Sequence, residues 1–495
     1  MRRLSARTLG EVPANVQIPR YDRQGIRIGM AHIGVGAFHR CHQAEFTEDV
    51  LEQGFADWGV VGINLHPPSL KDALDPQDGL YSRTLRKGEH AETRILGCIR
   101  RLIDGAAAVD DAQAALADAS IAAATMTVTE KGYCHIPATG TLDETHPDIV
   151  HDLRHPDRPR SAVGLIVAAL DRRRKSHGTG LTLISCDNIP ANGTVLRRVV
   201  STFAAACDPQ LAAWIDAEVR FPSTMVDRIV PATEASDLRR AAALCGLEDR
   251  AAVVGEPFRQ WVIEGDFQGR RPPWDLAGAE FVTNVHGHEL IKMRLLNAAQ
   301  SAWAYFGALS NLDYTFEAAR HPVLRPLVMQ MLAEESAATV PSVPGMAPDI
   351  YIPMVLERVA NPAIRHRNHQ VATDGSQKIV QRILNPVRDR IAAGRDFSGL
   401  ALVVGAWMAY LLVATPRFGS RWTVADPWYE DIARMAARRG DVASLVREIV
   451  GIQHIFGTDL QSDLFCEAVM PHVEGLLSGT PERYLALQRS QIAVA

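Results

Sequence analysis

The feature that most constrains this fold is an apolar strand that runs directly into a glycine-containing turn. Residues 26–35 read IRIGMAHIGV, and the run ends in the pair Gly34-x-Gly36. A helix-like stretch follows over residues 42–53, and a second apolar run, WGVVGIN, covers residues 58–64. Strand, glycine turn, helix and strand is the order in which dinucleotide-binding domains begin. We therefore expect an α/β fold that opens with a Rossmann-like domain.

Two further strands and a later change of pattern set the expected domain organisation. Residues 121–129 and 181–186 are apolar runs, each preceded by a helix-like stretch. From about residue 286 onward, long segments with helical periodicity replace the strand-like runs. We expect a Rossmann-like NAD(P)-binding domain over residues 1–283 and a mostly α-helical substrate and catalytic domain over residues 284–495.

Composition narrows the class of partner. The net charge is −5, with 22% charged and 47% hydrophobic residues, so the chain carries no basic footprint for nucleic acid or an anionic membrane. Seven scattered cysteines without a C-x-x-C pair argue against a disulfide framework and favour the reducing cytoplasm. The apolar run at residues 400–414 is shorter than the roughly 20 residues of a membrane span, which favours a buried helix. We expect a small-molecule partner, without nucleic acid or membrane.

The glycine turn has two of the three glycines of the G-x-G-x-x-G fingerprint, because His39 stands at the third position. Two glycines still permit a tight turn and close approach of the backbone to a pyrophosphate; the alternative is a turn that binds nothing. No carboxylate ends the second strand, so Asn64 is the candidate for the ribose hydroxyls and His66 for a 2′-phosphate. We expect NAD, with NADP open. The candidate cofactor-binding residues are Gly34, Gly36, Ala37, Phe38, His39, Arg40 and Asn64.

A second candidate site lies on the helix predicted over residues 288–309. Four polar side chains fall within an arc of roughly 140° at helical spacing. They are Glu289, Lys292, Asn297 and Gln300. Because the other positions are mostly apolar, burial would lower the pKa of Lys292 toward the range of a general base, and a nearby amide can donate to an alkoxide or carbonyl oxygen. The alternative is a surface ion pair between Glu289 and Lys292.

Other polar residues end predicted elements. Asn188 follows a predicted strand, at the edge where α/β sheets bind ligands, and Asn192 is the expected N-cap of the next helix. Asp227 lies between apolar residues, as a partly buried carboxylate. Asn188 and Asp227 each have a structural alternative, a turn or a satisfied buried acid. His286 and His288 do not share a helical face and have no third ligand at a suitable spacing, so we expect no metal.

Eight segments together resemble the mannitol dehydrogenase family, the long-chain polyol-specific dehydrogenases and reductases that include fructuronate, tagaturonate and arabinitol enzymes. The segments are GVGAFHRCHQA at 34–44, PQDGLYSRTL at 76–85, TVTEKGY at 127–133, SCDNIPANG at 185–193, FPSTMVDRIVP at 221–231, QWVIEGDF at 260–267, ELIKMRLLNAAQSAWAYFG at 289–307 and DGSQK at 374–378. They span nearly the whole chain in consistent order. The resemblance implies a Rossmann-like domain followed by a helical domain, metal-independent chemistry, and a monomer or small homo-oligomer.

The resemblance also implies roles for single residues. Lys292, in the pattern K-x₄-N, is implied as the catalytic base, with Asn297 and Asn188 as the amide pair that stabilises the developing oxyanion. It further implies that Glu289 is a proton relay, that Asp227 accepts a hydrogen bond from a substrate hydroxyl, and that Lys378 binds the polyol.

Two positions depart from the family pattern. The pattern usually continues K-x₄-N-x₂-H, but Gln300 replaces that histidine, and Gln370 stands where an arginine commonly precedes the DGSQK lysine. Gln300 cannot become cationic, and Gln370 lacks a bidentate guanidinium. Because the resemblance implies that both positions bind substrate, we expect retained redox chemistry with an unusual substrate preference.

Three functions remain open at this stage. The first is an NAD(P)-dependent, zinc-independent oxidoreductase that interconverts a secondary alcohol of a linear polyol and the ketose. The second is a fructuronate-type keto-uronate reductase, a mannonate oxidoreductase. It is favoured by the segment LHPPS…PQDGLY at residues 65–81, which resembles that branch of the family, with Arg365 or Arg367 as replacement for the missing arginine. The third is an NAD-binding regulatory protein that has lost turnover.

Overall fold

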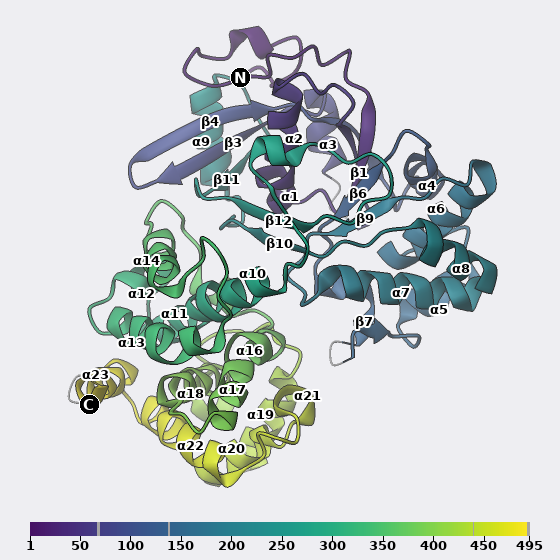
Figure 1. Cartoon of the computed structure of the whole chain (residues 1–495). Helices are drawn as coiled ribbons and strands as arrows, with labels where there is room; N and C mark the ends of the chain where they lie inside the picture. The colour runs from purple at the N-terminus through teal and green to yellow at the C-terminus, as the bar shows by residue number, and fades with distance from the viewer. Residues whose placement is uncertain (67–69, 137–138, 439, 493–495) are drawn as a thin grey trace. The chain divides into compact units, whose positions relative to one another are not determined.

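The chain forms two compact units, Met1–His286 and Gly287–Ala495, here called the N-terminal and the C-terminal unit (Figure 1). The computed structural model describes residues 1–66, 70–136, 139–438 and 440–492. The two units divide after residue 286. The change of sequence pattern falls in the same short segment, where the predicted boundary lies after residue 283.

A five-stranded sheet forms the centre of the N-terminal unit, with the strand order β5-β2-β1-β6-β9 (Figure 1). The strands are β1 (Ile28–Ile33), β2 (Gly59–Asn64), β5 (Ile99–Asp104), β6 (Ala123–Met126) and β9 (Thr182–Ser185). All neighbours are parallel. The order reverses between β1 and β6, which is the switch point where doubly wound sheets bind ligands. The Rossmann-like fold predicted from the sequence is confirmed.

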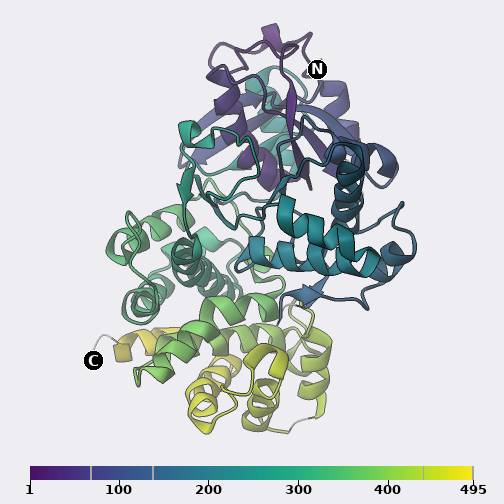
Figure 2. The same ribbon diagram turned by 45° about the vertical axis from the view of Figure 1, so that its right-hand side comes forward.

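Alternation along β1 buries both faces of this sheet. Ala31 and Ile33 pack with helices α4 (Val109–Ala117), α6 (Ala162–Ser176) and α7 (Asn192–Cys207). Met30 packs on the opposite face with α2 (Gln43–Glu52). The two views of Figures 1 and 2 show α6 and α7 on the same side of the strands.

Smaller sheets complete the N-terminal unit. One has the order β11-β3-β4, one β10-β12-β13, and β7 pairs with β8. Their bounds are β3 (Tyr81–Lys87), β4 (His90–Leu96), β7 (His135–Ile136), β8 (Thr141–Leu142), β10 (Thr224–Asp227), β11 (Val253–Gly255), β12 (Gln260–Glu264) and β13 (Glu280–Val282). The remaining helices are α1 (Ala37–Cys41), α3 (Lys71–Leu74), α5 (Pro147–Arg154), α8 (Pro209–Glu218) and α9 (Ala235–Cys245).

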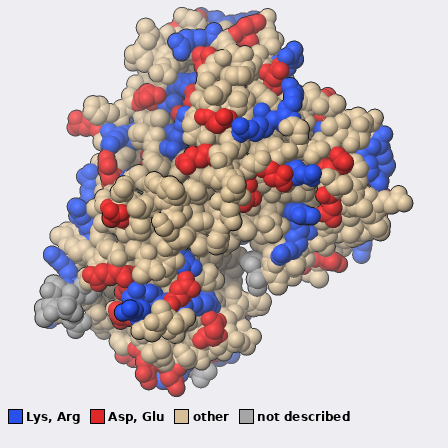
Figure 3. Space-filling model, viewed as in Figure 1, with Lys and Arg blue, Asp and Glu red and all other residues tan. Residues whose placement is uncertain are grey.

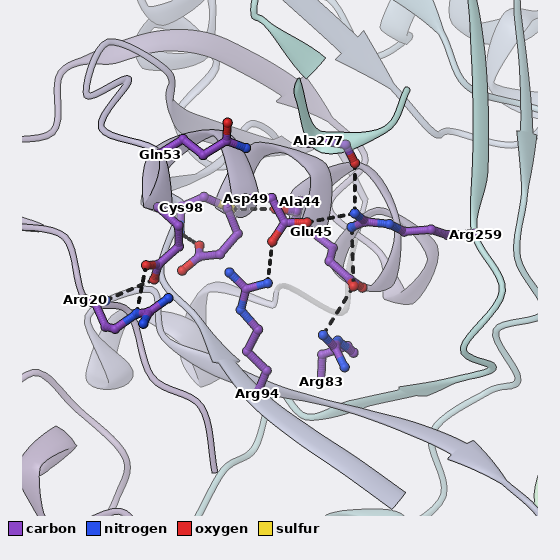
Figure 4. Close-up of polar contacts among 12 residues, drawn as sticks. Arg20, Ala44, Glu45, Asp49, Gln53, Arg83, Arg94, Cys98, Arg259 and Ala277 are labelled. Atoms are coloured by element: carbon purple, nitrogen blue, oxygen red, sulfur yellow. Dashed lines mark hydrogen bonds and ion pairs between the residues drawn. The ribbon is translucent and has the colours of Figure 1, made fainter. Parts of the chain in front are cut away.

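An arginine cluster anchors helix α2 (Figure 4). The Glu45 carboxylate lies 3.2 Å from Arg83 and 3.3 Å from Arg259, which Figure 4 labels. It also lies 2.5 Å from Arg228. Burial of the Glu45 carboxylate raises its pKa, but the three guanidinium groups outweigh that effect and lower the pKa to about 2.

Over the surface, Figure 3 shows acidic and basic side chains mixed on the visible face, consistent with the nearly balanced charge.

The described part of the C-terminal unit is helical. Its α-helices are α10 (His286–Ile291, which begins one residue earlier), α11 (Ala298–Leu309), α12 (Thr315–Arg320), α13 (Leu324–Gln330), α14 (Pro348–Val359), α15 (Asn368–Ala372), α16 (Gly375–Ile379), α17 (Asn385–Ala392), α18 (Ser398–Val413), α19 (Tyr429–Arg438), α20 (Val442–Val450), α21 (Gln453–Phe456), α22 (Asp463–Leu477) and α23 (Pro481–Ile492). Three segments are π-helical: η5 (Lys292–Asn297), η6 (Met331–Ser336) and η8 (Val380–Leu384).

The apolar run at residues 400–414 forms most of α18 and is buried along its length, so the prediction of a core helix is confirmed. Among the described residues, none of the helices combines the length and the apolar character needed to cross a membrane.

Candidate active site

The glycine turn after β1 has a backbone that only glycine tolerates at its first position. Gly34 has φ +89°, and a Cβ there would lie 2.2 Å from the carbonyl oxygen of Thr127. A Cβ on Gly36 would meet nothing closer than the Gly34 carbonyl oxygen at 3.8 Å, so this position faces open space. The first glycine therefore makes the turn, and the second leaves room beside it.

That room is a cavity of about 460 Å³ at the carboxyl ends of β1, β2 and β6. The glycine turn lines one side, Asn64 to His66 at the end of β2 another, and Thr127 to Thr129 after β6 a third. Its place at the switch point of the sheet is where a dinucleotide binds in folds of this type. Pro67 to Ser69, the rest of the LHPPS segment, lie outside the described residues.

His39, which replaces the third glycine, packs against the sheet instead of leaving space. Its ring stacks on His32 of β1, with centroids 3.5 Å apart and an interplanar angle of 13°. Burial holds the pKa of His39 well below its ordinary value and lowers the pKa of His32 to about 3, so both rings stack as neutral imidazoles. Ring stacking thus supplies the close contact between helix and strand that a third glycine usually permits.

The other candidate residues, Ala37, Phe38 and Arg40, follow the turn in helix α1. Arg40 donates from Nε to the Gly36 carbonyl oxygen at 3.2 Å and from Nη1 to the Ala251 carbonyl oxygen. Phe38 stacks on His42, and Ala37 is the first residue of α1. These positions hold or flank the turn, and direct contact of Ala37, Phe38, His39 or Arg40 with a cofactor stays a prediction.

Asn64 supports the same turn from the neighbouring strand. Its Oδ1 accepts a hydrogen bond from the Val35 backbone N–H at 2.6 Å, and its Nδ2 lies 3.4 Å from the Val35 carbonyl oxygen. Asn64 also lines the cavity, so its predicted contact with a ribose hydroxyl stays open beside this positioning role.

Asp187, which the sequence reasoning did not single out, organises the loop after β6. Its Oδ2 accepts from the Val128 N–H at 3.1 Å and from Tyr133 OH at 2.8 Å, and its Oδ1 accepts from the Thr129 N–H at 2.9 Å. Burial raises the pKa of Asp187 to about 6, although these three bonds lower it. The signal was the position of Asp187 directly after the strand predicted at residues 181–186, at the carboxyl edge of the sheet where α/β folds bind ligands.

The prediction that Asn192 caps helix α7 is wrong. Asn192 is the first helical residue and Ala191 holds the N-cap position, so the Asn192 side chain lies one residue too far into the helix to cap it and bonds to the adjoining loop and strand instead. Its Nδ2 donates to the carbonyl oxygens of Asp187 at 3.0 Å and Thr224 at 2.9 Å, and its Oδ1 accepts from the Thr224 N–H at 2.9 Å. Asn192 thereby ties the loop that carries exposed Asn188 to β10, which ends at buried Asp227.

In the C-terminal unit, the helix predicted over residues 288–309 is interrupted by the π-helical segment η5, which begins at Lys292 and ends at Asn297. The arc of roughly 140°, calculated for a regular α-helix, is therefore wrong. Hydrogen bonds in a π-helix run from residue i to i+5, so residues five apart share one face, as residues four apart do in an α-helix. Lys292 and Asn297 are five apart, and the π turn brings them toward one face of the helix.

Both residues are deeply buried. Lys292 is 4% exposed, Asn297 5% and Glu289, one turn earlier in α10, 7%. The surface-pair alternative for Glu289 and Lys292 is thus wrong, because neither side chain lies at the surface. Asn297 Nδ2 is 2.9 Å from Met293 Sδ, and half-buried Gln300 follows in α11.

The remaining predicted residues lie around α15 and α16. Lys378 donates from Nζ to the carbonyl oxygens of Thr373 at 2.5 Å and Val371 at 3.3 Å. Gln370 is exposed on α15. The guanidinium groups of Arg365 and Arg367 lie over the Tyr314 ring, at 4.6 and 5.3 Å from its centroid.

Arg382 is a further residue that the sequence reasoning missed. It lies in η8, the π-helical segment that follows α16, and its Nη1 donates to Ser301 Oγ at 3.0 Å. The same nitrogen lies 3.4 Å from the Asn297 carbonyl oxygen. No motif marked it, because the contact joins two segments about eighty residues apart.

His286 and His288 lie in α10, and within the described ranges no group of three or more His, Cys, Asp or Glu side chains is arranged to hold a metal ion. Metal-free chemistry stays a prediction.

Both units match a known protein family. Residues 28–276 match the domain described as Mannitol dehydrogenase Rossmann domain, and residues 284–477 match the Mannitol dehydrogenase C-terminal domain. A D-mannonate oxidoreductase of Escherichia coli (strain K12) is 39% identical over 449 residues, which cover 89% of this chain and 91% of that protein.

A mannitol 2-dehydrogenase of Pyrenophora tritici-repentis is 36% identical over 470 residues, covering 93% of this chain and 82% of the relative. Among solved structures, the ternary complex of Pseudomonas fluorescens mannitol 2-dehydrogenase with NAD and D-mannitol matches with a TM-score of 0.92 and 32% identity. That match covers 99% of this chain and all of the other.

Proposed function

This chain belongs to the mannitol dehydrogenase family, and on that premise we propose that it is an NAD(P)-dependent oxidoreductase that interconverts a secondary alcohol of a linear polyol and the corresponding ketose. The observation that carries the proposal is the π turn that brings buried Lys292 toward the face of its helix that bears Asn297. A base and an amide donor so placed suit proton removal from an alcohol whose oxygen becomes a carbonyl.

The N-terminal unit fits a dinucleotide. Gly34 makes the turn, Gly36 leaves open space, and the cavity lies at the switch point of a parallel sheet. Bound NAD(P) would supply the acceptor or donor of hydride. NAD is the first expectation and NADP stays open, because the described end of β2 has no carboxylate for ribose hydroxyls and offers His66 instead.

We assign the remaining roles as follows. Lys292 in its neutral form removes the alcohol proton, and Asn297 and Asn188 donate hydrogen bonds to the developing oxyanion. Glu289, one helical turn before Lys292, passes the proton to solvent. Asp227, Gln300, Gln370 and Lys378 orient the substrate.

A second candidate is a keto-uronate reductase that interconverts fructuronate and mannonate. The observation that favours it is the 39% identity with a D-mannonate oxidoreductase. Against it, Arg365 is already engaged, because its Nη2 donates to Tyr314 OH at 3.0 Å and its guanidinium covers the ring of the same residue.

The test is a panel of reactions followed by the absorbance of the reduced nicotinamide. NAD and NADP are each assayed with mannitol, arabinitol, sorbitol, altritol and mannonate, and NADH and NADPH with fructose and fructuronate. Turnover with neutral polyols supports the first candidate, and turnover confined to uronates supports the second. Cofactor binding without any turnover would contradict both and leave the regulatory protein.

A cytoplasmic location and a monomer or small homo-oligomer also stay predictions. Size-exclusion chromatography with light scattering tests the oligomeric state.

A further inference from the structure

Thr129 has a backbone conformation that a β-branched residue rarely adopts. Its φ is 66° and its ψ is 166°, in a region occupied almost only by glycine. Thr129 is exposed and lines the cofactor cavity, so packing does not hold it there. Strain of this kind persists only where other contacts enforce it.

The contacts that enforce it come from Asp187. One carboxylate oxygen accepts from the Thr129 N–H, and the other accepts from the preceding Val128 N–H and from Tyr133 OH. Tyr133 OH also lies 2.5 Å from Ser185 Oγ, on the last residue of β9. Both oxygens therefore act only as acceptors, which suits a carboxylate and no neutral side chain of the same shape.

The backbone of Asp187 is held by other partners than its carboxylate. Its carbonyl oxygen accepts from Asn192 Nδ2 at 3.0 Å and from the Ile189 N–H at 2.9 Å. Asn192 in turn makes two hydrogen bonds to Thr224 of β10. Asn188 lies between Asp187 and Asn192 in the chain. Because hydrogen bonds hold both of these residues, the backbone of Asn188 is held from both sides.

We propose that Asp187 is a positioning residue that couples the two halves of the site within the N-terminal unit. Its carboxylate holds the strained Val128–Thr129 backbone that lines the cofactor cavity, while its main chain holds the loop that presents Asn188. The inference rests on the proposed function. Loss of the carboxylate weakens cofactor binding and, at saturating cofactor, lowers kcat through a displaced Asn188.

Asp187→Asn is the primary test. An amide keeps one acceptor oxygen and turns a donor toward the N–H of either Thr129 or Val128, so one of these bonds is replaced by a repulsive contact. We expect the Kd for NADH, measured by fluorescence titration, to rise at least about tenfold. Thermal unfolding of each variant reports whether it is folded.

Glu335→Gln is the matched control. Glu335 of η6 also accepts one backbone N–H on each carboxylate oxygen, from Gly399 at 2.7 Å and Leu400 at 2.8 Å, but it does not line the cofactor cavity. In Glu335→Gln, the amide nitrogen would likewise face a backbone N–H and replace one of these hydrogen bonds by a repulsive contact. We expect it to lower the melting temperature and leave the Kd for NADH unchanged.

Rescue separates positioning from general stability. Thr129→Gly removes the strain, because glycine adopts positive φ without cost. In the Asp187→Asn background it should recover much of the NADH affinity, whereas a purely structural role for Asp187 predicts no recovery. Tyr133→Phe removes one donor without adding a conflict, and we expect a smaller rise in Kd.

Folded Asp187→Asn protein with the wild-type Kd would overturn the inference alone. If that variant does not fold, an unchanged Kd for Tyr133→Phe would overturn it. Wild-type protein that binds neither NADH nor NADPH would overturn the proposed function and this inference with it.

Discussion

The two units present their candidate chemistry in different ways. In the N-terminal unit, polar groups follow the ends of parallel strands and are held by hydrogen bonds between segments far apart in sequence, as Asn64 holds Val35 and Asp187 holds Val128. In the C-terminal unit, Lys292 and Asn297 belong to one helix, and a local change from α to π geometry aligns them. Substitutions in the two units should therefore separate cofactor binding from turnover.

The sharpest separation is expected at Lys292. Lys292→Met removes the proposed base, and general-base catalysis typically contributes about 10²–10⁴ in rate, so kcat should fall by that factor. The Kd for NADH should stay near the wild-type value, because the glycine-turn cavity belongs to the other unit. Steady-state kinetics and NADH titration of the same preparation check both. Near wild-type turnover would end the assignment of the base.

Gly34→Ala is the corresponding change in the N-terminal unit. The added Cβ would meet the Thr127 carbonyl oxygen at 2.2 Å, so the turn must shift and NADH affinity should fall more than tenfold. Gly54→Ala is the matched control, since Gly54 has φ +92° but nothing within 4 Å of its Cβ. Gly54→Ala should cost only the roughly 1–2 kcal/mol of a left-handed alanine and leave NADH binding intact. Equal Kd values for the two variants would contradict this account of the turn.

Two buried acids, Glu45 of the N-terminal unit and Glu335 of the C-terminal unit, should respond to pH in opposite directions. The pKa of Glu45 is lowered to about 2 from an ordinary 4.5, so its contribution to stability is present above pH 4.5 and is lost as the pH falls toward 2. Glu45→Gln should cost about 3–5 kcal/mol at neutral pH, because it removes the carboxylate that pairs with the buried guanidinium group of Arg228 and weakens the cluster around Arg83 and Arg259. Denaturant melts between pH 2 and 7 should show that cost shrinking in acid; a constant cost would contradict the ion-pair account.

Glu335 supplies the contrast. Burial raises its pKa to about 7, so the folded state favours the protonated form. Its contribution to stability is present below pH 4.5 and is lost as the pH rises through 7. Wild-type protein should lose stability over that interval, and Glu335→Gln should flatten the profile there. An unchanged slope in the variant would assign the loss to other groups.

The smallest effects are expected at the two departures from the family pattern. Gln300→His restores a group that can become cationic, and Gln370→Arg restores a guanidinium on the exposed side of α15. We expect each to change the ratio of kcat/KM for neutral polyols over uronates by up to about tenfold while kcat with the better substrate stays similar. Identical ratios in all variants would remove both positions from substrate selection.

The sequence predicted what depends on local pattern. The β1 turn, the strands around it and the helical C-terminal unit follow from apolar periodicity and the positions of Gly34 and Gly36. Strand β5 was not predicted, because Arg100 and Arg101 interrupt its apolar run.

The sequence could not show contacts between distant segments. The bonds of Asp187 to Val128 and of Asn192 to Thr224 join loops that only the folded sheet brings together. The π turn at Lys292 also escaped prediction, because its residues are good α-helix formers and nothing in their spacing marks an extra residue per turn. The sequence thus indicated the candidate residues individually, but it did not show how the fold places their side chains relative to one another.

The most direct test of the central claim is transfer of deuterium from substrate carbon to cofactor. The protein is incubated with NAD and with alcohols from the panel that carry deuterium on the carbinol carbon, and the reduced cofactor is analysed by mass spectrometry. The account predicts one deuterium in NADH with the wild type, and labelled NADH formed about 10²–10⁴ times more slowly with Lys292→Met, although both bind NADH. Unlabelled NADH from the wild type, or labelled NADH formed by Lys292→Met at the wild-type rate, would contradict it.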